Sequence, residues 1–189
     1  MNAAEETVRR CPWGDSGDAL MREYHDCEWG KPCFDERRLF EMLTLEGAQA
    51  GLSWATVLKK REAYRAAFGG FGVREVAAYG GEKTAELLGN AGIIRNRLKI
   101  ASAVRNANAV LRLGSLREFL WNYVDGEPVV NAWERQNDMP ATSELSDRIS
   151  RDMKKLGFTF VGSTIIYSYL QAVGIVNDHM TWCGFRFGK

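Results

Sequence analysis

Residues 42–58 read MLTLEGAQAGLSWATVL and contain the end of one predicted helix and the start of the next. Apolar residues recur at helical spacing before and within this stretch, which predicts a helix over residues 36–46 that ends near Gly47. Ser53 is a suitable N-cap for a second helix, predicted over residues 54–68. A loop of small residues therefore joins a helix that ends in a carboxylate to a helix that begins with a tryptophan.

The carboxylate and the tryptophan on either side of this loop are Glu46 and Trp54. If the two helices meet at this corner, both side chains face one cavity. An indole ring has a negative face and a carboxylate only accepts hydrogen bonds, so the pair can bind a flat, electron-poor, hydrogen-donating ring. A surface glutamate and a core tryptophan are an equally valid interpretation of this stretch alone.

The loop between the two helices carries Gln49 and Leu52. Leu52 lies between Gly51 and Ser53 at the predicted loop tip, where an apolar side chain is exposed to a partner. Apolar side chains in such positions can wedge between bases and unstack DNA.

The composition indicates a globular protein with one sizeable core or two small lobes, because 46% of the 189 residues are hydrophobic and 26% are charged. The net charge of +1 neither demands nor excludes nucleic acid. No apolar run is long enough to span a membrane. Residues 1–10 lack the apolar core of a signal peptide, which predicts a loose tail on a cytoplasmic protein that has no membrane partner.

Helical spacing recurs along the rest of the chain and no convincing strand pattern is present, so we expect an all-α fold. Residues 11–33 are predicted to be an irregular segment that carries a site, with one short helix over 19–23, and residues 126–143 to be mostly loop. Further helices are predicted over 73–79, 82–89, 116–124 and 164–173. Two more are predicted from their inward faces. One face consists of Ile100, Val104, Ala107 and Leu111, and the other of Leu145, Ile149, Met153 and Leu156.

Both histidines and two of the four cysteines lie near the ends of the chain. Cys11 and His25 are near the start, whereas His179 and Cys183 are near the end and four residues apart, so one helical turn would direct both at a single point. Two thiolates and two imidazoles can form a closed, tetrahedral and therefore structural zinc site.

One zinc ion at this position would tie the two ends of the chain together. We then expect a single unit over residues 1–189, with a helical region over about 36–115 and a zinc-bearing lobe formed by 11–35 and 116–189. The alternative is that the histidines are ordinary hydrogen-bonded groups and the thiols are free, with Cys27 and Cys33 as spare ligand candidates. An iron–sulfur cluster fits poorly because the cysteines do not form a closely spaced run.

A tight turn at residues 90–94 joins the predicted helix over 82–89 to the next one. The backbone N–H groups of such a turn and of the following helix N-terminus can hold a phosphate without reading sequence, and Arg95 follows at once. Basic residues cluster here and at two other places, which indicates either solvated faces or contacts to a DNA backbone: Arg95, Arg97 and Lys99; Lys59, Lys60 and Arg61; and Arg151, Lys154 and Lys155.

Four aromatic residues lie near Glu46 in sequence and could line a base-sized slot with it: Trp13, Tyr24, Trp29 and Trp54. The alternative is that these rings fill the core, as most aromatic residues do in a chain with 6 tryptophans.

Five motifs, in order along the chain, resemble 3-methyladenine DNA glycosylase I of bacteria: YHDCEWG at 24–30, LEGAQAGLSW at 45–54, AGIIRNR at 91–97, GFTFVG at 157–162 and VNDH at 176–179. The resemblance runs from about Cys11 to Cys183. Several long motifs in the same order are far more specific than any one of them.

The resemblance implies a helix–hairpin–helix glycosylase fold, with that motif near residues 82–111, and one structural zinc ion. It implies the following site residues: Cys11, His25, His179 and Cys183 for the zinc; Glu46, Tyr24 and Trp54, with Trp13 and Trp29 nearby, for a flipped base; Gln49 and Leu52 for the gap left in the duplex; and Gly92, Ile93, Ile94 and Arg95 for the DNA backbone.

The activity implied by the resemblance is DNA repair by hydrolysis of the bond between 3-methyladenine and its sugar, without a lyase step. The partners would be double-stranded DNA with alkylated bases and the free base as product, and we expect a monomer. Glu46 would be the catalytic residue, because an ionised carboxylate favours a cationic base. The resemblance suggests that this family lacks the usual water-activating aspartate.

One departure from the family pattern is Met21, at the position where some members have a second pocket tyrosine. Other interpretations therefore stay open. They are a glycosylase with a different preferred base, a non-catalytic zinc-containing module that binds damaged or bent duplex DNA, and a zinc-stapled interaction protein with no role on DNA.

Overall fold

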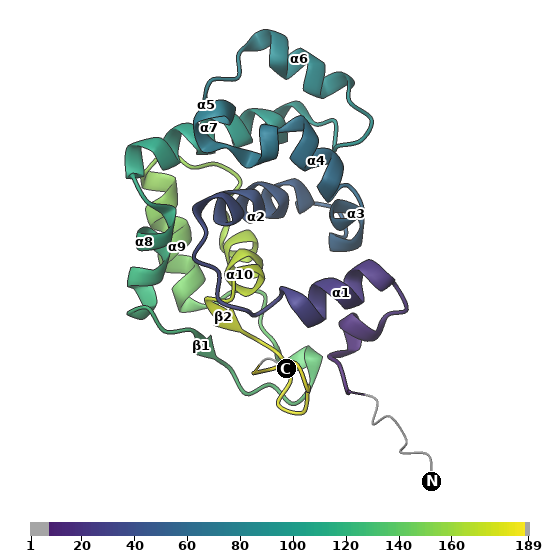
Figure 1. The fold of residues 1–189 in the computed structure, drawn as a ribbon. Helices are drawn as coiled ribbons and strands as arrows, with labels where there is room; N and C mark the ends of the chain where they lie inside the picture. The colour runs from purple at the N-terminus through teal and green to yellow at the C-terminus, as the bar shows by residue number, and fades with distance from the viewer. Residues whose placement is uncertain (1–7, 188–189) are drawn as a thin grey trace.

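The computed structural model describes residues 8–187, and its regular structure is almost entirely helical (Figure 1). The helices are α1 Ala19–Cys27, α2 Glu36–Gln49, α3 Trp54–Leu58, α4 Arg61–Ala67, α5 Val73–Ala77, α6 Gly81–Gly89, α7 Arg97–Leu113, α8 Leu116–Trp121, α9 Glu144–Lys155 and α10 Ser163–Ala172. Four 3-10 turns accompany them: η1 Pro12–Asp15, η2 Gly69–Phe71, η3 Asn122–Val124 and η4 Gln136–Asp138. The prediction of a mainly helical fold is confirmed.

The expectation of no strand is wrong in one detail. β1 (Val129–Val130) pairs in parallel with β2 (Val176–Asn177), which joins the long loop after α8 to the segment after α10. Two-residue strands are too short to leave an alternating pattern in the sequence, so only the tertiary contact reveals them.

Helix α2 lies in the middle of the molecule, with α4 and α7 on one side of it and α10 on the other (Figure 1). Every residue from Leu39 to Ala48 is buried. A helix that is buried all round needs partners on every side, and α2 packs against α3, α7, α8 and α10. The polar residues of α2 are therefore buried with the apolar ones, and this is how Glu46 reaches the interior.

The predicted end of the central helix near Gly47 is wrong, because α2 continues to Gln49. Gly47 serves packing instead: a Cβ atom there would lie 3.4 Å from the Cβ atom of Phe160. Gln49 is therefore the last helical residue and not a loop residue, and the loop is shortened to residues 50–53. Ser53 caps α3 as predicted, with its hydroxyl accepting from the Thr56 N–H at 3.2 Å.

The helix predicted over residues 54–68 is broken into α3 and α4. Nothing in the apolar spacing marks this break, because Val57, Leu58, Tyr64 and Phe68 are all buried across it. In α7 the predicted core face ends wrongly at Leu111, which is 46% exposed, while Val110 is buried instead. In the same way Leu156 is 40% exposed because α9 ends at Lys155, after which helical spacing no longer applies.

The segment predicted to be irregular contains more helix than expected. Asp18 caps α1 by accepting from the N–H groups of Leu20 and Met21, and the helix continues to Cys27. Tyr24 and His25 are therefore helical and buried. Residues 1–7 of the predicted tail lie outside the described residues. None of the described helices is both long and apolar enough to cross a lipid bilayer.

Candidate active site and metal centre

A cavity of about 260 Å³ opens beside the C-terminal half of α2. Ten residues from distant parts of the chain line it: Trp13, Met21, Tyr24, Trp29, Glu46, Gln49, Trp54, Met139, Ser168 and Gln171. The structure therefore brings together all five residues that the sequence suggested for a base-sized slot. Gln49 and the divergent Met21 border the same space.

The predicted wall residues come from separate parts of the chain, and Trp29 lies in the turn after α1. Trp13 lies in η1, Tyr24 in α1 and Glu46 in α2, while Trp54 is the first residue of α3. The Tyr24 and Trp54 rings are 5.2 Å apart between centroids, and the Trp13 and Trp29 rings meet edge to face at 4.9 Å. These separations are typical of aromatic pairs that pack directly, so the rings form a continuous wall.

Glu46 is the one carboxylate among the described residues that line this cavity. The side chain is only 4% exposed, and its Oε2 atom is buried without a hydrogen-bond partner. Burial raises the pKa of Glu46 to about 8. An unpaired buried polar atom costs free energy, so such an atom that borders a cavity points to a ligand.

A donor without a partner accompanies this acceptor. The Trp54 Nε1 atom is also buried and has no partner among the described residues. Burial, followed by the charge of Glu46, raises the pKa of Tyr24, so its phenol stays protonated. The pocket thus holds an acceptor, an indole donor and a neutral phenol next to aromatic faces.

Sequence reasoning missed Met139, Ser168 and Gln171 as pocket residues. Ser168 and Gln171 are three residues apart on α10, whose other residues are almost all apolar. Two polar residues on one face of a buried helix were the available signal for a site. Met139 follows η4 in a long loop, and nothing in the local sequence distinguishes it.

The Gln171 amide is held by a buried aspartate. Asp178 is fully buried and accepts four hydrogen bonds of 2.6–2.7 Å, from Asn131, Trp133, Tyr167 and the Nε2 atom of Gln171. A carboxylate can only accept, so Nε2 must face Asp178 and the Gln171 carbonyl oxygen is turned elsewhere. Asp178 therefore fixes the orientation of one wall of the pocket.

A second cavity, of about 180 Å³, adjoins the first and shares Glu46, Gln49 and Ser168 with it. Leu52 lines this second space and is 41% exposed at the loop tip, next to Gly51 with φ +78°. An apolar side chain is thus presented to solvent beside a path that leads to Glu46.

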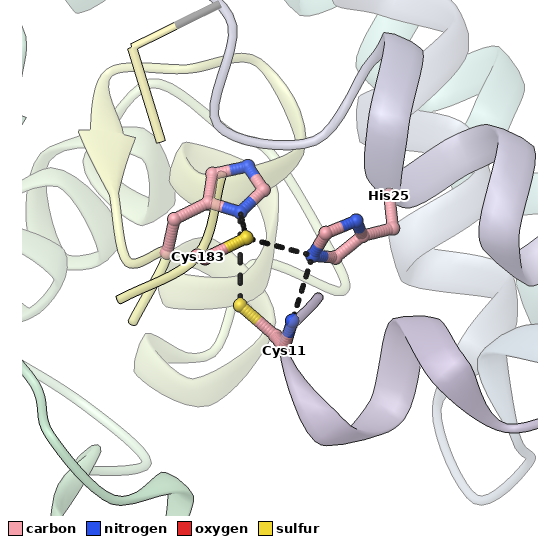
Figure 2. Close-up of side chains that lie close together, drawn as sticks. Cys11, His25 and Cys183 are labelled. Carbon is pink, nitrogen blue, oxygen red and sulfur yellow. Dashed lines mark hydrogen bonds between the residues drawn. The ribbon is translucent and has the colours of Figure 1, made fainter. Parts of the chain in front are cut away.

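Four candidate metal ligands converge near this pocket, as the sequence predicted: Cys11, His25, His179 and Cys183. Figure 2 labels three of them, Cys11, His25 and Cys183. All four are buried, and their ligand atoms lie within 4.8 Å of one another. The expected helical turn between His179 and Cys183 is wrong, since this segment is irregular. A tight turn closed by the Cys183 N–H and the Met180 carbonyl brings them together instead.

Each imidazole of this cluster has a second partner that orients it. His25 Nδ1 lies 2.8 Å from Asp26, which also accepts from Arg10, and His179 Nε2 lies 3.0 Å from the Trp29 carbonyl. Because a carboxylate and a carbonyl only accept, both nitrogens must carry the proton. The other nitrogens, His25 Nε2 and His179 Nδ1, then present lone pairs to the sulfurs, which is the arrangement of metal-ligating histidines.

The cluster offers two cysteine sulfurs and two imidazole lone pairs. Two thiolates with two neutral imidazoles are the donor set that zinc prefers, so the residues fit a metal ion of this kind. Cys27 is exposed and Cys33 half-buried, and neither belongs to the cluster.

The cluster of four candidate metal ligands and the pocket wall are in direct contact. The Trp29 ring lies 4.7 Å from His179, and the Trp13 ring lies 5.0 Å from His25. Tyr24 is the neighbour of His25 on α1. A metal ion bound by the four ligands would therefore also stabilise the positions of three aromatic residues of the pocket wall, Trp13, Tyr24 and Trp29.

Helices α6 and α7 are joined by the hairpin of residues 90–96. Within this hairpin the Asn90 side chain accepts from the Gly92 N–H at 2.8 Å, and the Ile94 N–H donates to the Tyr64 hydroxyl at 3.2 Å. Ile93 is buried beneath the turn and Arg95 is exposed. The hairpin is thus a well-packed turn with a cation on its surface.

The three basic clusters of the sequence divide in the structure. Arg61 binds Glu28, Lys59 pairs with Asp18 and Lys155 with Asp152. Lys60 and Lys99 donate to backbone carbonyls. Among the described residues, Arg95 and Arg97 form no ion pair and remain exposed at the start of α7.

Comparison with known proteins agrees with this geometry. The family model of the methyladenine glycosylases matches residues 13–187. The chain is 47% identical over 180 residues to DNA-3-methyladenine glycosylase 1 of Escherichia coli K12. The aligned residues cover 93% of this chain and 96% of the relative. Over 178 residues it is 42% identical to a Haemophilus influenzae DNA-3-methyladenine glycosylase, with coverage of 92% and 96%.

Solved structures give the same result. A crystal structure of 3-methyladenine DNA glycosylase I matches with a TM-score of 0.90 at 48% identity, covering 93% of this chain and 98% of the other. A Staphylococcus aureus 3-methyladenine DNA glycosylase I, from work on its recognition of 3-methyladenine, matches with a TM-score of 0.89 at 34% identity, covering 92% and 95%. The chain belongs to the methyladenine glycosylase family.

Proposed function

We propose that this protein is a DNA repair glycosylase that turns 3-methyladenine out of alkylated duplex DNA and hydrolyses its bond to the sugar. The observation that carries the proposal is the buried, unpartnered Oε2 atom of Glu46 at the wall of an aromatic cavity. A base must leave the stack before its sugar bond can be reached, and the cavity offers a place for it. Relatives that are 42–47% identical are named for this activity.

The chemistry of the substrate explains why one carboxylate suffices. Alkylation at N3 makes the base cationic and weakens its bond to the sugar, so the base departs as a neutral molecule and needs little acid catalysis. Without a bound base, burial keeps Glu46 largely protonated at neutral pH, because its pKa is raised to about 8. A cation in the pocket favours the ionised carboxylate, and the rings of Trp54 and Tyr24 add cation–π attraction of about 2 kcal/mol when water is excluded.

The reaction is proposed to end with hydrolysis and to include no lyase step. A lyase needs an amine nucleophile at the sugar, and no lysine lines the cavity among the described residues. The same lining contains no second carboxylate to activate water. Glu46 is therefore the catalytic residue, and water attacks a sugar whose leaving group is already activated.

The proposed DNA surface combines the loop tip and the hairpin. Leu52 enters the base stack and Gln49 fills the gap left by the flipped base. The hairpin between α6 and α7 acts as a helix–hairpin–helix element, in which Gly92, Ile93, Ile94 and Arg95 meet the DNA backbone. Two observations support this proposed DNA surface: Leu52 is exposed at the edge of the cavity, and Arg95 is exposed on the hairpin.

The metal cluster is proposed to hold one structural zinc ion through Cys11, His25, His179 and Cys183. Zinc would supply no chemistry here, since four protein ligands close its coordination. We further propose that the protein acts as a monomer in the cytoplasm. A monomer is the simplest assembly for a chain that must enclose part of a duplex.

The proposal is tested by incubating the protein with methylated duplex DNA and identifying the released bases by chromatography. We expect release of 3-methyladenine and no strand cleavage. Glu46→Gln should lower this release at least tenfold and weaken the binding of free 3-methyladenine, because a neutral amide replaces the carboxylate. Glu144→Gln, at an exposed position on α9, is the matched control and should act like the wild type.

Two results would contradict the proposal. Binding to methylated DNA without any release of base would favour the non-catalytic DNA-binding module. Unchanged release by the Glu46→Gln variant would remove the catalytic role assigned to Glu46, even if the overall activity were present.

A further inference from the structure

Two lysines from the predicted basic clusters are half-buried and donate to backbone carbonyls. The Lys99 ammonium donates to the carbonyl oxygens of Ala48 at 2.8 Å and Ala50 at 2.7 Å. Lys99 lies in the first turn of α7, just after the hairpin, whereas Ala48 and Ala50 lie at the end of α2. One side chain therefore links the hairpin helix to the helix that carries Glu46.

The carbonyls that Lys99 meets are those that a helix end leaves without partners. The last carbonyls of any α-helix lack intrahelical N–H groups, and a cation there is favourable. The Lys99 ammonium supplies both the hydrogen bonds and the charge where α2 passes into the loop of residues 50–53. Partial burial lowers the pKa of Lys99.

Lys60 makes a second bridge of the same kind. Its ammonium donates to the carbonyls of Ala91 at 2.9 Å and Gly92 at 3.3 Å, both in the hairpin. Lys60 lies between α3, which begins with Trp54, and α4. In Figure 1 the end of α2, α3, and the chain from α6 into α7 lie on the same side of the molecule.

We propose that Lys99 and Lys60 are positioning residues that fix the hairpin relative to the loop carrying Leu52, and are not phosphate ligands. This inference rests on the proposed function, in which the hairpin holds the backbone while the loop enters the stack. The two surfaces must meet one duplex at the same time, so their separation has to be fixed before DNA binds. A misplacement of about 1 Å at such a site can lower a rate about 100-fold.

The chemistry of the two ammonium groups supports positioning over phosphate binding. Each ammonium has three donors and already uses two of them on carbonyls. Arg95 and Arg97, by contrast, are exposed and form no ion pair among the described residues. The arginines are therefore available to bind DNA, whereas the lysines are bound to backbone carbonyls of the protein itself.

The test measures three properties of Lys99→Met: affinity for free 3-methyladenine, single-turnover release from methylated duplex, and the salt dependence of affinity for a duplex with one reduced abasic site. We expect unchanged affinity for the free base, a decrease in release of about tenfold or more, and an unchanged salt slope. Lys99→Arg should recover part of the release. Lys155→Met, which removes the same charge from α9, is the control for charge alone.

Comparison variants separate the possible roles. Arg95→Gln should reduce the salt slope by about 0.9, as expected for one lost phosphate contact. Lys60→Met should behave like Lys99→Met. The effects of Lys99→Met and Leu52→Ala on release should be non-additive, because both act through the same loop.

Three outcomes would overturn the inference: a salt slope that falls in Lys99→Met as in Arg95→Gln, a release rate that does not change, or a lost affinity for free 3-methyladenine. If the wild type released no 3-methyladenine, the proposed function itself would fail. The affinity for the abasic duplex and its salt slope would then still report whether Lys99 contacts phosphate.

Discussion

At the scale of single residues, α2 contains two buried carboxylates in opposite circumstances. Glu41 forms ion pairs with Arg38 at 2.8 Å and Arg65 at 2.9 Å. Glu46, five residues later, has an orphaned Oε2 atom and a pKa raised to about 8 by burial. The protein thus pairs the carboxylate that stabilises the fold and leaves unpaired the one that faces the cavity.

The raised pKa of Glu46 predicts a pH-dependent stability. A glutamate in water has an ordinary pKa of 4.5, so between about pH 4.5 and 8 the native state keeps a proton that the unfolded state has lost. The free energy of unfolding should therefore fall by about 1.4 kcal/mol per pH unit through this range from this group alone. Glu46→Gln removes the dependence, so the variant should gain stability relative to the wild type as pH rises.

Urea denaturation of both proteins at about pH 5, 6.5 and 8, a range that spans the shift, measures this difference directly, since the other titrating groups cancel. Glu144→Gln, at an exposed position, should follow the wild type at every pH. Parallel stability curves for Glu46→Gln and the wild type would show that burial does not raise the pKa of Glu46.

At the scale of elements, the end of α10 connects the pocket to the cluster of candidate metal ligands. The helix carries Ser168 and Gln171, and the chain then passes through Gly174 to β2 and Asp178. Gly174 has a φ of +68°, and a Cβ atom there would overlap the carbonyl group of Lys31. The chain reverses here because only glycine tolerates both the dihedral angle and the close approach.

The matched glycine at the end of α7 makes this a testable claim. Gly114 has a φ of +92°, but the space that a Cβ atom would occupy there has no neighbouring atoms within 4 Å. Gly114→Ala should therefore cost about 1–3 kcal/mol from backbone strain alone, because φ +92° with ψ −57° is a conformation that residues with a side chain rarely adopt. Gly174→Ala should cost several kcal/mol more, because the backbone of residues 31 and 32 must also move.

Thermal or urea unfolding of the two variants checks the prediction. We also expect Gly174→Ala to weaken the binding of free 3-methyladenine, because the displaced segment holds Gln171 through Asp178. Equal destabilisation by the two substitutions would mean that the close approach at Gly174 relaxes without cost.

At the scale of the whole molecule, the first and last described segments meet at the cluster of four candidate metal ligands. Cys11 and Cys183 are separated by nearly the whole described chain, yet both belong to one buried group. A metal ion bound by all four residues would close this long loop, and its binding free energy would add to the stability of the folded chain. The same cluster supports Trp13, Tyr24 and Trp29, so metal binding should influence the pocket as well as the fold.

Metal removal tests this link. The purified protein should contain about one zinc per chain by elemental analysis, and a chelator should remove it and lower the Tm by about 10 °C or more. Cys183→Ser should lose the metal, whereas Cys27→Ser, at an exposed position outside the cluster, should keep it. A full zinc content in Cys183→Ser, or a Tm that ignores chelation, would contradict the assignment.

Much of this protein follows from local sequence. Apolar spacing predicts most of the helices because a helical face repeats every three to four residues wherever the helix packs. The types of residue near the corner at 46–54 indicate a carboxylate beside aromatic rings, and the positions of both histidines and two cysteines indicate a metal site. These signals depend on which residue types the chain carries and at what spacing, and the structure places the corresponding side chains together.

Other features arise only from packing between distant segments. Several features depend on segments that are distant in sequence: the unpaired state of Glu46, the carbonyl bridges of Lys60 and Lys99, the Asp178 network around Gln171 and the pairing of β1 with β2. No local pattern encodes such contacts, because a lysine in solvent and a lysine bound to a backbone carbonyl look identical in sequence. The sequence alone determined which helices form and which chemical groups are available, whereas the tertiary structure decided which groups meet, because desolvation and hydrogen-bond pairing depend on what the folded chain places around each atom.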